Sequence, residues 1–505
     1  MTTQGFQHTN RRILAIAGAL LACAVVAGPG GARAEDEAFG HAGGAAADRP
    51  NVVLIMFDDL GWADVGYQGS EHAATPNIDA MAEASLVFER FYAAAPVCSP
   101  TRGSCLTGRH PFRYGVYFAN TGSLPEDEVN LAALLQGAGY RTGHFGKWHL
   151  GTLTTEMTDA NRGRPGNTQH FAPPWQRGFD VCLSTEGKVP TYNPMVRPRD
   201  FAGRPGNLQH WWDPDIAPDY AMHYGTRYWN ERGEEATEGL DGPNARVIMD
   251  AAIPFIEDSV RREVPFLAVV WFHEPHWPVV AGPDDTAPFA ELSRFEQHYY
   301  GCIRAADAQI GRLRRTLRRL GVAQNTMVWL ASDNGPEGNA SMPGSAGPLR
   351  GRKRALYEGG VRVPGLLEWP ARIERGRTTG VPAVTSDYVP TLAGLLGLEL
   401  PSDRPIDGVS LVPLIDGRMT ERPRPIAFQS RGQIALTDNR YKIIHAGRGG
   451  SFAQPPWRWE LYDLIDDPGE SNDLAAEHPE IVRQMAEQLA QWNESVRTCL
   501  ARLEP

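Results

Sequence analysis

Apolar runs alternate with segments of helical periodicity along most of the chain. Three runs are apolar at nearly every position, and a fourth, more mixed run also favours a strand: residues 51–57, 265–272 and 326–331, and then 140–145. A strand that is apolar almost throughout is typical of a sheet buried on both faces. Helical patterns fall between them, at 78–88 and 131–137. The alternation predicts an α/β fold, with a large, mostly parallel sheet and helices on both faces.

Polar side chains follow each of these predicted strands. The segments are Asp58-Asp59, Gly146-Lys147-Trp148-His149, His273-Glu274-Pro275-His276 and Ser332-Asp333-Asn334-Gly335. In open parallel sheets the carboxyl ends of the strands are where ligands bind. Two adjacent buried carboxylates also need a cation nearby.

Oxygen donors from two strand ends could meet at this edge. Asp58, Asp59, Asp333 and Asn334 are hard ligands, which favour calcium or magnesium over zinc. A turn or a helix cap explains either pair taken alone. The two pairs together favour a metal site.

One stretch, from Cys98 to Arg109, has the signals of a short capped helix. Ser99 is predicted as the N-cap, with Pro100 at the first helical position and Gly108 after the last turn. Cys98 would then precede the helix at the positive end of its dipole, where a thiolate or an anion is favoured. A capped helix with an incidental cysteine explains these residues equally well.

Composition limits the classes of function. The chain has 505 residues, with 49 basic and 60 acidic side chains and a net charge of −11. This balance argues against a nucleic-acid partner. An anionic substrate would have to be bound by a local group of cations.

The N-terminal 34 residues resemble an export signal. Arg11 and Arg12 precede an apolar run over 13–27, and Ala32 and Ala34 form a small-x-small cleavage site. We expect no membrane span, and a periplasmic or secreted bacterial protein exported by the Sec or the twin-arginine route. Four cysteines outside the signal and besides Cys98 permit three disulfide pairings: Cys105, Cys182, Cys302 and Cys499.

The remaining chain divides by texture. A Gly/Ala-rich linker over 35–50 leads into a large domain over 51–418, and a C-terminal subdomain over 419–505 is predicted as a small antiparallel sheet with one packed helix. Residues 160–245 are predicted to be an irregular, aromatic-rich insertion. Trp211 and Trp212 within it could stack on a sugar or simply pack together.

The run Cys98-Ser-Pro100-Thr-Arg102 resembles the signature of the type I, formylglycine-dependent sulfatases, arylsulfatase-like members of the alkaline phosphatase superfamily. Six ordered blocks extend the resemblance over most of the chain: Asp58-Asp59, Cys98 to Arg109, Gly146 to Gly151, Pro275-His276-x-Pro278, Ser332 to Gly335, and Lys353 within LRGRKRALYEGGVRVP. The LYDL run at 461–464 also resembles the family's tail. The resemblance implies an alkaline-phosphatase-like sheet within 51–418 and hydrolysis of sulfate esters.

The resemblance also implies roles for the matching residues. Cys98 would be oxidised to formylglycine by a maturation enzyme, and its hydrated aldehyde would attack the sulfur. Asp58, Asp59, Asp333, Asn334 and the modified Cys98 would bind Ca²⁺, with Mg²⁺ as the alternative. Arg102 and His149 would contact the formylglycine, while Lys147, His276, Lys353 and, by a loose match, Ser184 would bind the sulfate. His276 or Lys353 would protonate the leaving alcohol, and His273 is expected to make only a structural hydrogen bond.

Other functions fit the same motifs. A phosphonate or phosphate ester hydrolase on this scaffold differs only in its substrate, and a non-catalytic sugar-binding homologue would keep the fold. The expected substrates are sulfated glycans, with aryl sulfates as artificial ones.

Overall fold

A computed structural model describes residues 49–201, 205–447, 449, 452 and 456–502. The predicted signal and most of the predicted linker lie outside these residues. A ten-stranded sheet forms the centre, and its strands in spatial order are β11 (Glu235–Ala236), β10 (Tyr228–Asn230), β5 (Val181–Thr185), β4 (Arg141–Lys147), β12 (Phe266–Trp271), β1 (Asn51–Phe57), β13 (Thr326–Ser332), β15 (Gly365–Glu368), β2 (Leu86–Phe88) and β16 (Arg377–Thr379).

The middle of this sheet is parallel. β5, β4, β12, β1 and β13 run in one direction, and Leu54 of β1 lies between Val269 and Trp329 of its two neighbours. Antiparallel pairs occur on either side, at β5–β10 and at β13–β15. The predicted mostly parallel sheet is confirmed.

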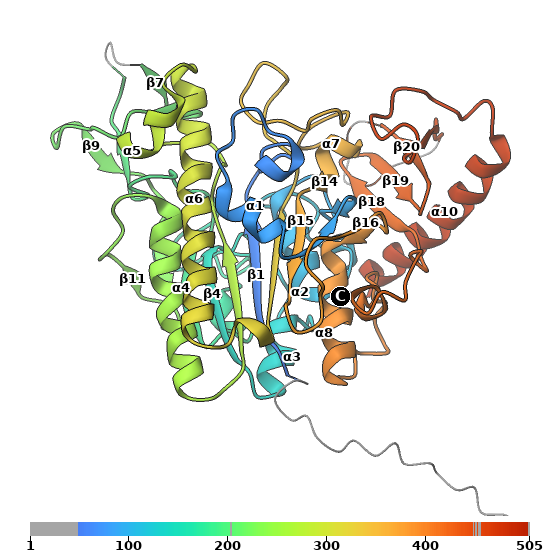
Figure 1. Cartoon of the computed structure of the whole chain (residues 1–505), viewed down its shortest axis with the longest axis horizontal. Coiled ribbons are helices and arrows are strands. Elements are labelled where there is room, and N and C mark those ends of the chain that lie inside the picture. The colour runs from blue at the N-terminus through green and yellow to red at the C-terminus, as the bar shows by residue number, and fades with distance from the viewer. Residues whose placement is uncertain (1–48, 202–204, 448, 450–451, 453–455, 503–505) are drawn as a thin grey trace, which may run out of the picture. The chain divides into compact units, whose positions relative to one another are not determined.

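Side chains of β1 alternate between two cores. Leu54 and Met56 belong to one core and Ile55 and Phe57 to the other. The first core is covered by α2 (Cys98–Thr107), α3 (Leu131–Gly137) and α8 (Tyr388–Leu396), and the second by α1 (Pro76–Ala82), α4 (Asn244–Arg261) and α6 (Arg294–Arg319). Figure 1 shows α4 and α6 side by side along the sheet. Two helical layers therefore enclose a sheet that is apolar on both faces.

The C-terminal segment forms a second, antiparallel sheet. Its strands are β18 (Ile426–Ser430), β19 (Gln433–Thr437), β20 (Tyr441–His445) and β21 (Glu460–Asp463). One face packs on Tyr92 and Val361 of the large domain, and the other packs on Met485 and Leu489 of α10 (Pro479–Ala501). A short sheet of β14 (Arg362–Val363), β3 (Phe91–Tyr92) and β17 (Ala383–Val384) lies beside α7 (Glu358–Val361). The predicted sheet and helix are confirmed (Figure 1).

Two sequence predictions need correction. The helix predicted over 78–88 ends at Ala82, and Leu86–Phe88 forms β2, because a short apolar run fits either structure. The segment 160–245 is not wholly irregular, since it supplies β5, β10 and β11 to the main sheet. It also carries two small pairs, β6 (Val196–Pro198) with β9 (Ala221–His223) and β7 (Gly206–Asn207) with β8 (Trp211–Trp212).

The tryptophans and cysteines of the chain are largely internal. Trp212 is buried, and the Trp211 ring lies 5.4 Å from that of His298, so packing explains both. Each of the five described cysteines is a buried free thiol, which leaves none of the three disulfide pairings formed. Within the described ranges, no helix has the length and apolar character needed to cross a bilayer.

Candidate active site

Two neighbouring parallel strands deliver four oxygen-bearing residues to one edge of the sheet. β1 ends at Phe57 opposite Ser332, the last residue of β13, so Asp58-Asp59 and Asp333-Asn334 emerge together. The backbone N–H of Asp59 donates to Asp333 Oδ1 over 3.1 Å, which ties the two turns to each other. All four side chains are buried.

The cysteine lies at the start of a helix, as expected, but inside it. Cys98 is the first residue of α2, and Val97 is the N-cap without a side-chain bond, so the predicted N-cap at Ser99 is wrong. Thr101, in the first turn, instead ties the helix to the segment before it: its hydroxyl donates to the Ala95 carbonyl over 2.9 Å and accepts the Ala95 N–H over 3.3 Å. Gly108 ends the helix in the left-handed conformation, as predicted.

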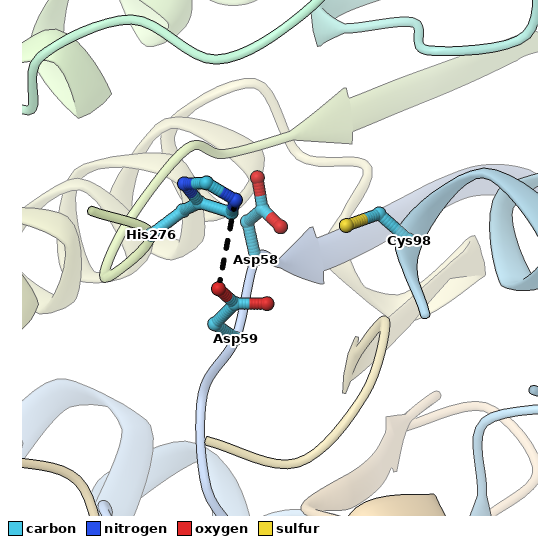
Figure 2. Close-up of side chains that lie close together, drawn as sticks. All are labelled: Asp58, Asp59, Cys98 and His276. Atoms are coloured by element: carbon cyan, nitrogen blue, oxygen red, sulfur yellow. Dashed lines mark ion pairs between the residues drawn. The ribbon is translucent and has the colours of Figure 1, made fainter. Parts of the chain in front are cut away.

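A compact group of potential ligands surrounds the two aspartates. Ligand atoms of Asp58, Asp59, Cys98 and His276 all lie within 4.8 Å of one another. Figure 2 shows the Cys98 sulfur and the His276 ring approaching the aspartate pair from opposite sides. Parts of three elements therefore meet at the ends of the central strands.

Three buried cations hold the carboxylates. Lys147 Nζ lies 2.5 Å from Asp58 Oδ2, and Lys353 Nζ lies 2.6 Å from Asp59 Oδ1. Arg102 pairs with Asp333 at 2.7 Å, and its guanidinium also donates to the backbone carbonyl of Lys147. Adjacent buried carboxylates were expected to need cations nearby. Lys147, Lys353 and Arg102, all within the sequence motifs described above, are those cations.

Several buried oxygens in the group keep no hydrogen-bond donor among the described residues. They are Asp58 Oδ1, Asp59 Oδ2 and Asn334 Oδ1. Leaving such atoms unpaired is costly, so a buried acceptor without a donor indicates a missing partner. Oxygen atoms of this kind fit a hard divalent cation, and the residues present can hold one.

Asp333 differs from the other candidate ligands. Its Oδ2 accepts two bonds from Arg102 and its Oδ1 accepts the Asp59 N–H, so both oxygens have partners in this structure. Asn334 instead donates from Nδ2 to Asp59 Oδ1 and leaves its carbonyl oxygen free. Asp333 therefore lies beside the two aspartates, and its carboxylate orients the Arg102 guanidinium.

Burial and charge shift the pKa values in different directions. Burial alone would raise the pKa of Asp58, but the Lys147 ammonium and other cations hold it well below its usual value. Burial, with the neighbouring Asp58 charge, raises the pKa of Asp333 to about 7. Burial raises the pKa of Cys98 to about 12, so the unmodified thiol is neutral despite its place at the start of the helix.

Two histidines complete the site, and their ring bonds define their tautomers. His276 Nδ1 lies 2.7 Å from the Trp277 carbonyl, which can only accept, so Nδ1 carries the proton and Nε2 faces Asp59. His149 Nε2 lies 2.9 Å from Asn120 Oδ1, and its Nδ1 has no partner among the described residues. Burial lowers the pKa of both rings, which keeps them neutral.

Backbone strain marks the same place. Asp59 has φ 68° and His149 has φ 58°, a region that residues other than glycine seldom adopt. Such conformations persist where the surrounding structure imposes them, and they concentrate at functional sites.

Two of the residues considered in the sequence have other partners. The Ser184 hydroxyl lies 2.7 Å from His144 Nδ1 and is fully buried, which removes it from the predicted sulfate contacts. His273 Nε2 lies 3.2 Å from the Thr185 hydroxyl, in agreement with the structural hydrogen bond expected for it.

The sequence analysis missed three neighbours of the site. Glu337 pairs with Lys353 at 3.3 Å. It comes shortly after the predicted strand over 326–331, so its position near the end of that strand was a usable signal. Lys188 follows β5, which was hidden in the segment predicted as irregular. Asn120, the partner of His149, lies in a loop that no pattern marks.

The fold and these residues define a buried, charged site that could hold a divalent cation, and comparisons with known proteins give its class. The sulfatase family profile matches residues 50–398, and that of the N-sulphoglucosamine sulphohydrolase C-terminal region matches 351–495. N-acetylgalactosamine-6-sulfatase of Sus scrofa is 34% identical over 412 residues, which are 78% of this chain and 71% of the relative. Arylsulfatase A of Homo sapiens is 33% identical over 485 residues, or 88% of each chain.

A solved structure supports the same assignment. The crystal structure of Ps i-CgsB matches with a TM-score of 0.73 and 27% identity, and covers 88% of this chain and 93% of that one. It has also been solved in complex with k-i-k-neocarrahexaose. The chain belongs to the sulfatase family, and the predicted alkaline-phosphatase-like fold is confirmed. It is an enzyme that hydrolyses sulfuric esters.

Proposed function

We propose that this sulfatase removes sulfate from glycans, with formylglycine at position 98 and a divalent cation bound beside it. The observation that carries the proposal is the set of buried acceptors without donors, Asp58 Oδ1, Asp59 Oδ2 and Asn334 Oδ1, next to the Cys98 sulfur. Burying an acceptor without a donor is costly, and three such oxygens gathered around one point favour a bound cation there.

The cation is proposed to be calcium, with magnesium as the alternative. Asp58, Asp59, Asp333 and Asn334 offer only oxygen, and the described residues place no second thiol beside Cys98. When bound, the ion would offset the carboxylate charge and make the hydrated aldehyde of residue 98 a nucleophile at neutral pH.

Lys147, Lys353 and Arg102 supply the positive charge that an ester's sulfate needs. Lys147 Nζ lies 2.5 Å from Asp58 and Lys353 Nζ lies 2.6 Å from Asp59, the two aspartates beside Cys98. Three fixed cations in a buried site stabilise an anion more strongly than they would in water. Arg102 acts by holding Asp333 and the Lys147 carbonyl in place.

Proton transfer can be assigned from the hydrogen bonds. His276 in its neutral form carries its proton on Nδ1, bonded to the Trp277 carbonyl, so its Nε2 has no proton to give. Lys353 therefore fits better as the donor to the leaving alcohol. His149, with Nδ1 free, fits as the acceptor of a proton when the sulfate departs and the aldehyde returns.

Glycans are the proposed substrates because the relatives support them. The names of N-acetylgalactosamine-6-sulfatase and the neocarrahexaose complex of Ps i-CgsB refer to sugars. Aryl sulfates should serve as artificial substrates. The protein would be periplasmic or secreted, and would require a formylglycine-generating enzyme during its production.

The test measures the release of inorganic sulfate, phosphate and phosphonate from matched aryl esters and from sulfated sugars. We expect sulfate release to have the highest kcat/KM. Faster phosphonate hydrolysis would instead favour the ester-hydrolase alternative. Sugar binding without release, by protein whose Cys98 remains a thiol, would favour a non-catalytic homologue.

A further inference from the structure

Lys188 is a cation beside the site that has no counterion in the part of the chain that the structure describes. It follows Thr185, the last residue of β5, and Thr185 is opposite Lys147 in the parallel pair of β5 and β4. Lys188 therefore emerges at the same sheet edge as the sulfate-binding lysine. Among the described residues, no carboxylate forms an ion pair with it, and its side chain is partly buried.

The loop that carries Lys188 is firmly held. The Thr185 hydroxyl donates to the Gly187 carbonyl over 2.8 Å, and the Thr226 hydroxyl donates to the Lys188 carbonyl over 3.0 Å. Between them, Glu186 is fully buried and paired with Arg162 at 2.9 Å. The position of Lys188 is thus fixed by its backbone, while its ammonium group stays available.

The surroundings of Lys188 are dominated by positive charge. Burial lowers its pKa, and the charges of Lys147 and Lys353 lower it further, with partial opposition from Asp59 and Glu337. The other cations already have carboxylate partners, Lys147 in Asp58 and Lys353 in Asp59 and Glu337. One positive charge of the group is therefore not neutralised by any described residue.

The segment beyond Lys188 packs against the loop that carries His276. The charge of Lys188 also lowers the pKa of His210 and of His276, which burial lowers most. The His210 ring packs edge-on against Trp277 with 4.6 Å between centroids, and its carbonyl accepts the Val279 N–H over 2.8 Å. This contact joins the segment around β8 to the loop that carries His276.

We propose that Lys188 binds a second anionic group of the substrate, a carboxylate or a further sulfate carried by the same glycan as the ester that is cleaved. The inference rests on the proposed function, and it narrows the substrates to glycans with at least two anionic groups. A charge-assisted hydrogen bond to a partly buried ammonium contributes binding that a singly charged ester cannot gain.

The test compares Lys188→Gln with wild type on three probes. These are 4-nitrophenyl sulfate, with one anionic group, a disulfated hexosamine, and a sulfated hexosamine linked to a uronic acid. We expect the substitution to lower kcat/KM about tenfold on the disulfated or the uronate probe, mainly through KM, and less than about threefold on the aryl ester. The probe that loses most identifies whether sulfate or carboxylate is bound.

Matched variants separate this effect from misfolding and from general charge. Arg199→Gln removes an exposed cation from the same insertion and should change no probe by more than about twofold. Lys188→Arg should restore most of the activity on the preferred probe. In wild type, salt should weaken the reaction of the preferred probe more steeply than that of the aryl ester.

The possible failures are distinguishable. Equal losses on all three probes would mean that Lys188 acts on the cleaved sulfate itself, and no loss on any would mean that it binds nothing; either result overturns the inference. Wild type that releases no sulfate from any probe would overturn the proposed function instead.

Discussion

Two buried groups of charges in this molecule are built in opposite ways. Asp387, at the start of α8, accepts two bonds on each oxygen, from Arg422 and from the backbone N–H groups of Val384 and Val409. Asp58 and Asp59 are equally buried, yet each keeps one oxygen without a donor. Both groups have cations beside them, so burial and ion pairing alone do not separate a structural site from a functional one.

The difference lies in what is left unsatisfied. Both oxygens of Asp387 are satisfied by the chain itself, and the ion pair links Arg422 to the large domain, with only the Arg422 Nε donor left without a partner among the described residues. The aspartate pair is held in place by lysines but left open toward Cys98 and His276. Carboxylate oxygens are left without a donor at the aspartate pair and not at Asp387, and this contrast predicts different consequences for the same substitution at the two places.

The largest effect is expected at the open site itself. Cys98→Ala should lower kcat at least about 10⁴-fold, because it removes the nucleophile, with little change in thermal unfolding. Cys105→Ala is the matched control, since it removes a buried thiol from the same helix and should leave kcat near the wild-type value. Sulfate release under saturating substrate measures both, and comparable activity in the two variants would contradict a covalent role for Cys98.

Asp387→Asn should act on stability. Removing the charge leaves Arg422 buried with a neutral partner, which should lower the free energy of unfolding by about 3 kcal/mol. Asp416→Asn, at a more exposed ion pair with Arg372, should cost less than about 1 kcal/mol. Denaturant unfolding measures the difference, while kcat per folded molecule should be unchanged in both variants.

Asp59→Asn should have the reverse profile. Burial raises the pKa of Asp59, and Lys353 keeps Glu337 as a second partner, so loss of the charge should change the stability of metal-free protein by less than about 1 kcal/mol. Activity and bound divalent metal should both fall at least about 10²-fold. Metal analysis and sulfate release check this, and full metal content in the variant would remove Asp59 from the ligands.

The smallest effect is a dependence of the free energy of unfolding on pH, caused by a buried histidine away from the candidate active site. Burial lowers the pKa of His110, beside Asp407, to about 3. The unfolded chain binds the proton near pH 6.5 and the folded chain does not, so this group destabilises the protein as pH falls from 6.5 toward 3. Between pH 7 and pH 5, His110→Gln should remove about 2 kcal/mol of pH-dependent loss, measured as unfolding curves at the two pH values. An unchanged pH slope would contradict the assigned cause.

The sequence predicted those features that local pattern determines. The apolar run 51–57 gave the first strand with its bounds, and the helix over 131–137 was also placed correctly. Asp58, Asp59, Asp333 and Asn334 come directly after two of these strands. Since the carboxyl ends of parallel strands lie at one edge of the sheet, the sequence could predict that these residues meet. The family's sequence blocks brought Lys147 and Lys353 into the same group.

Other features depend on contacts between distant parts of the chain, which no local pattern contains. Asn120 orients His149 from a loop, and Ser184 faces His144 rather than the site because of its position along β5. The strand β5 was missed because five residues of mixed polarity, VCLST, resemble a loop until β4 and β10 flank them. The same omission hid Lys188.

The central claim is that the chain carries an aldehyde at position 98 within its open site. Mass spectrometry of the peptide containing Cys98, from protein produced together with a formylglycine-generating enzyme, tests this directly. The account predicts the mass of the aldehyde and its hydrate in place of the thiol, with Cys105 in the same peptide unchanged. Fully unmodified Cys98 in protein that still releases sulfate would contradict it.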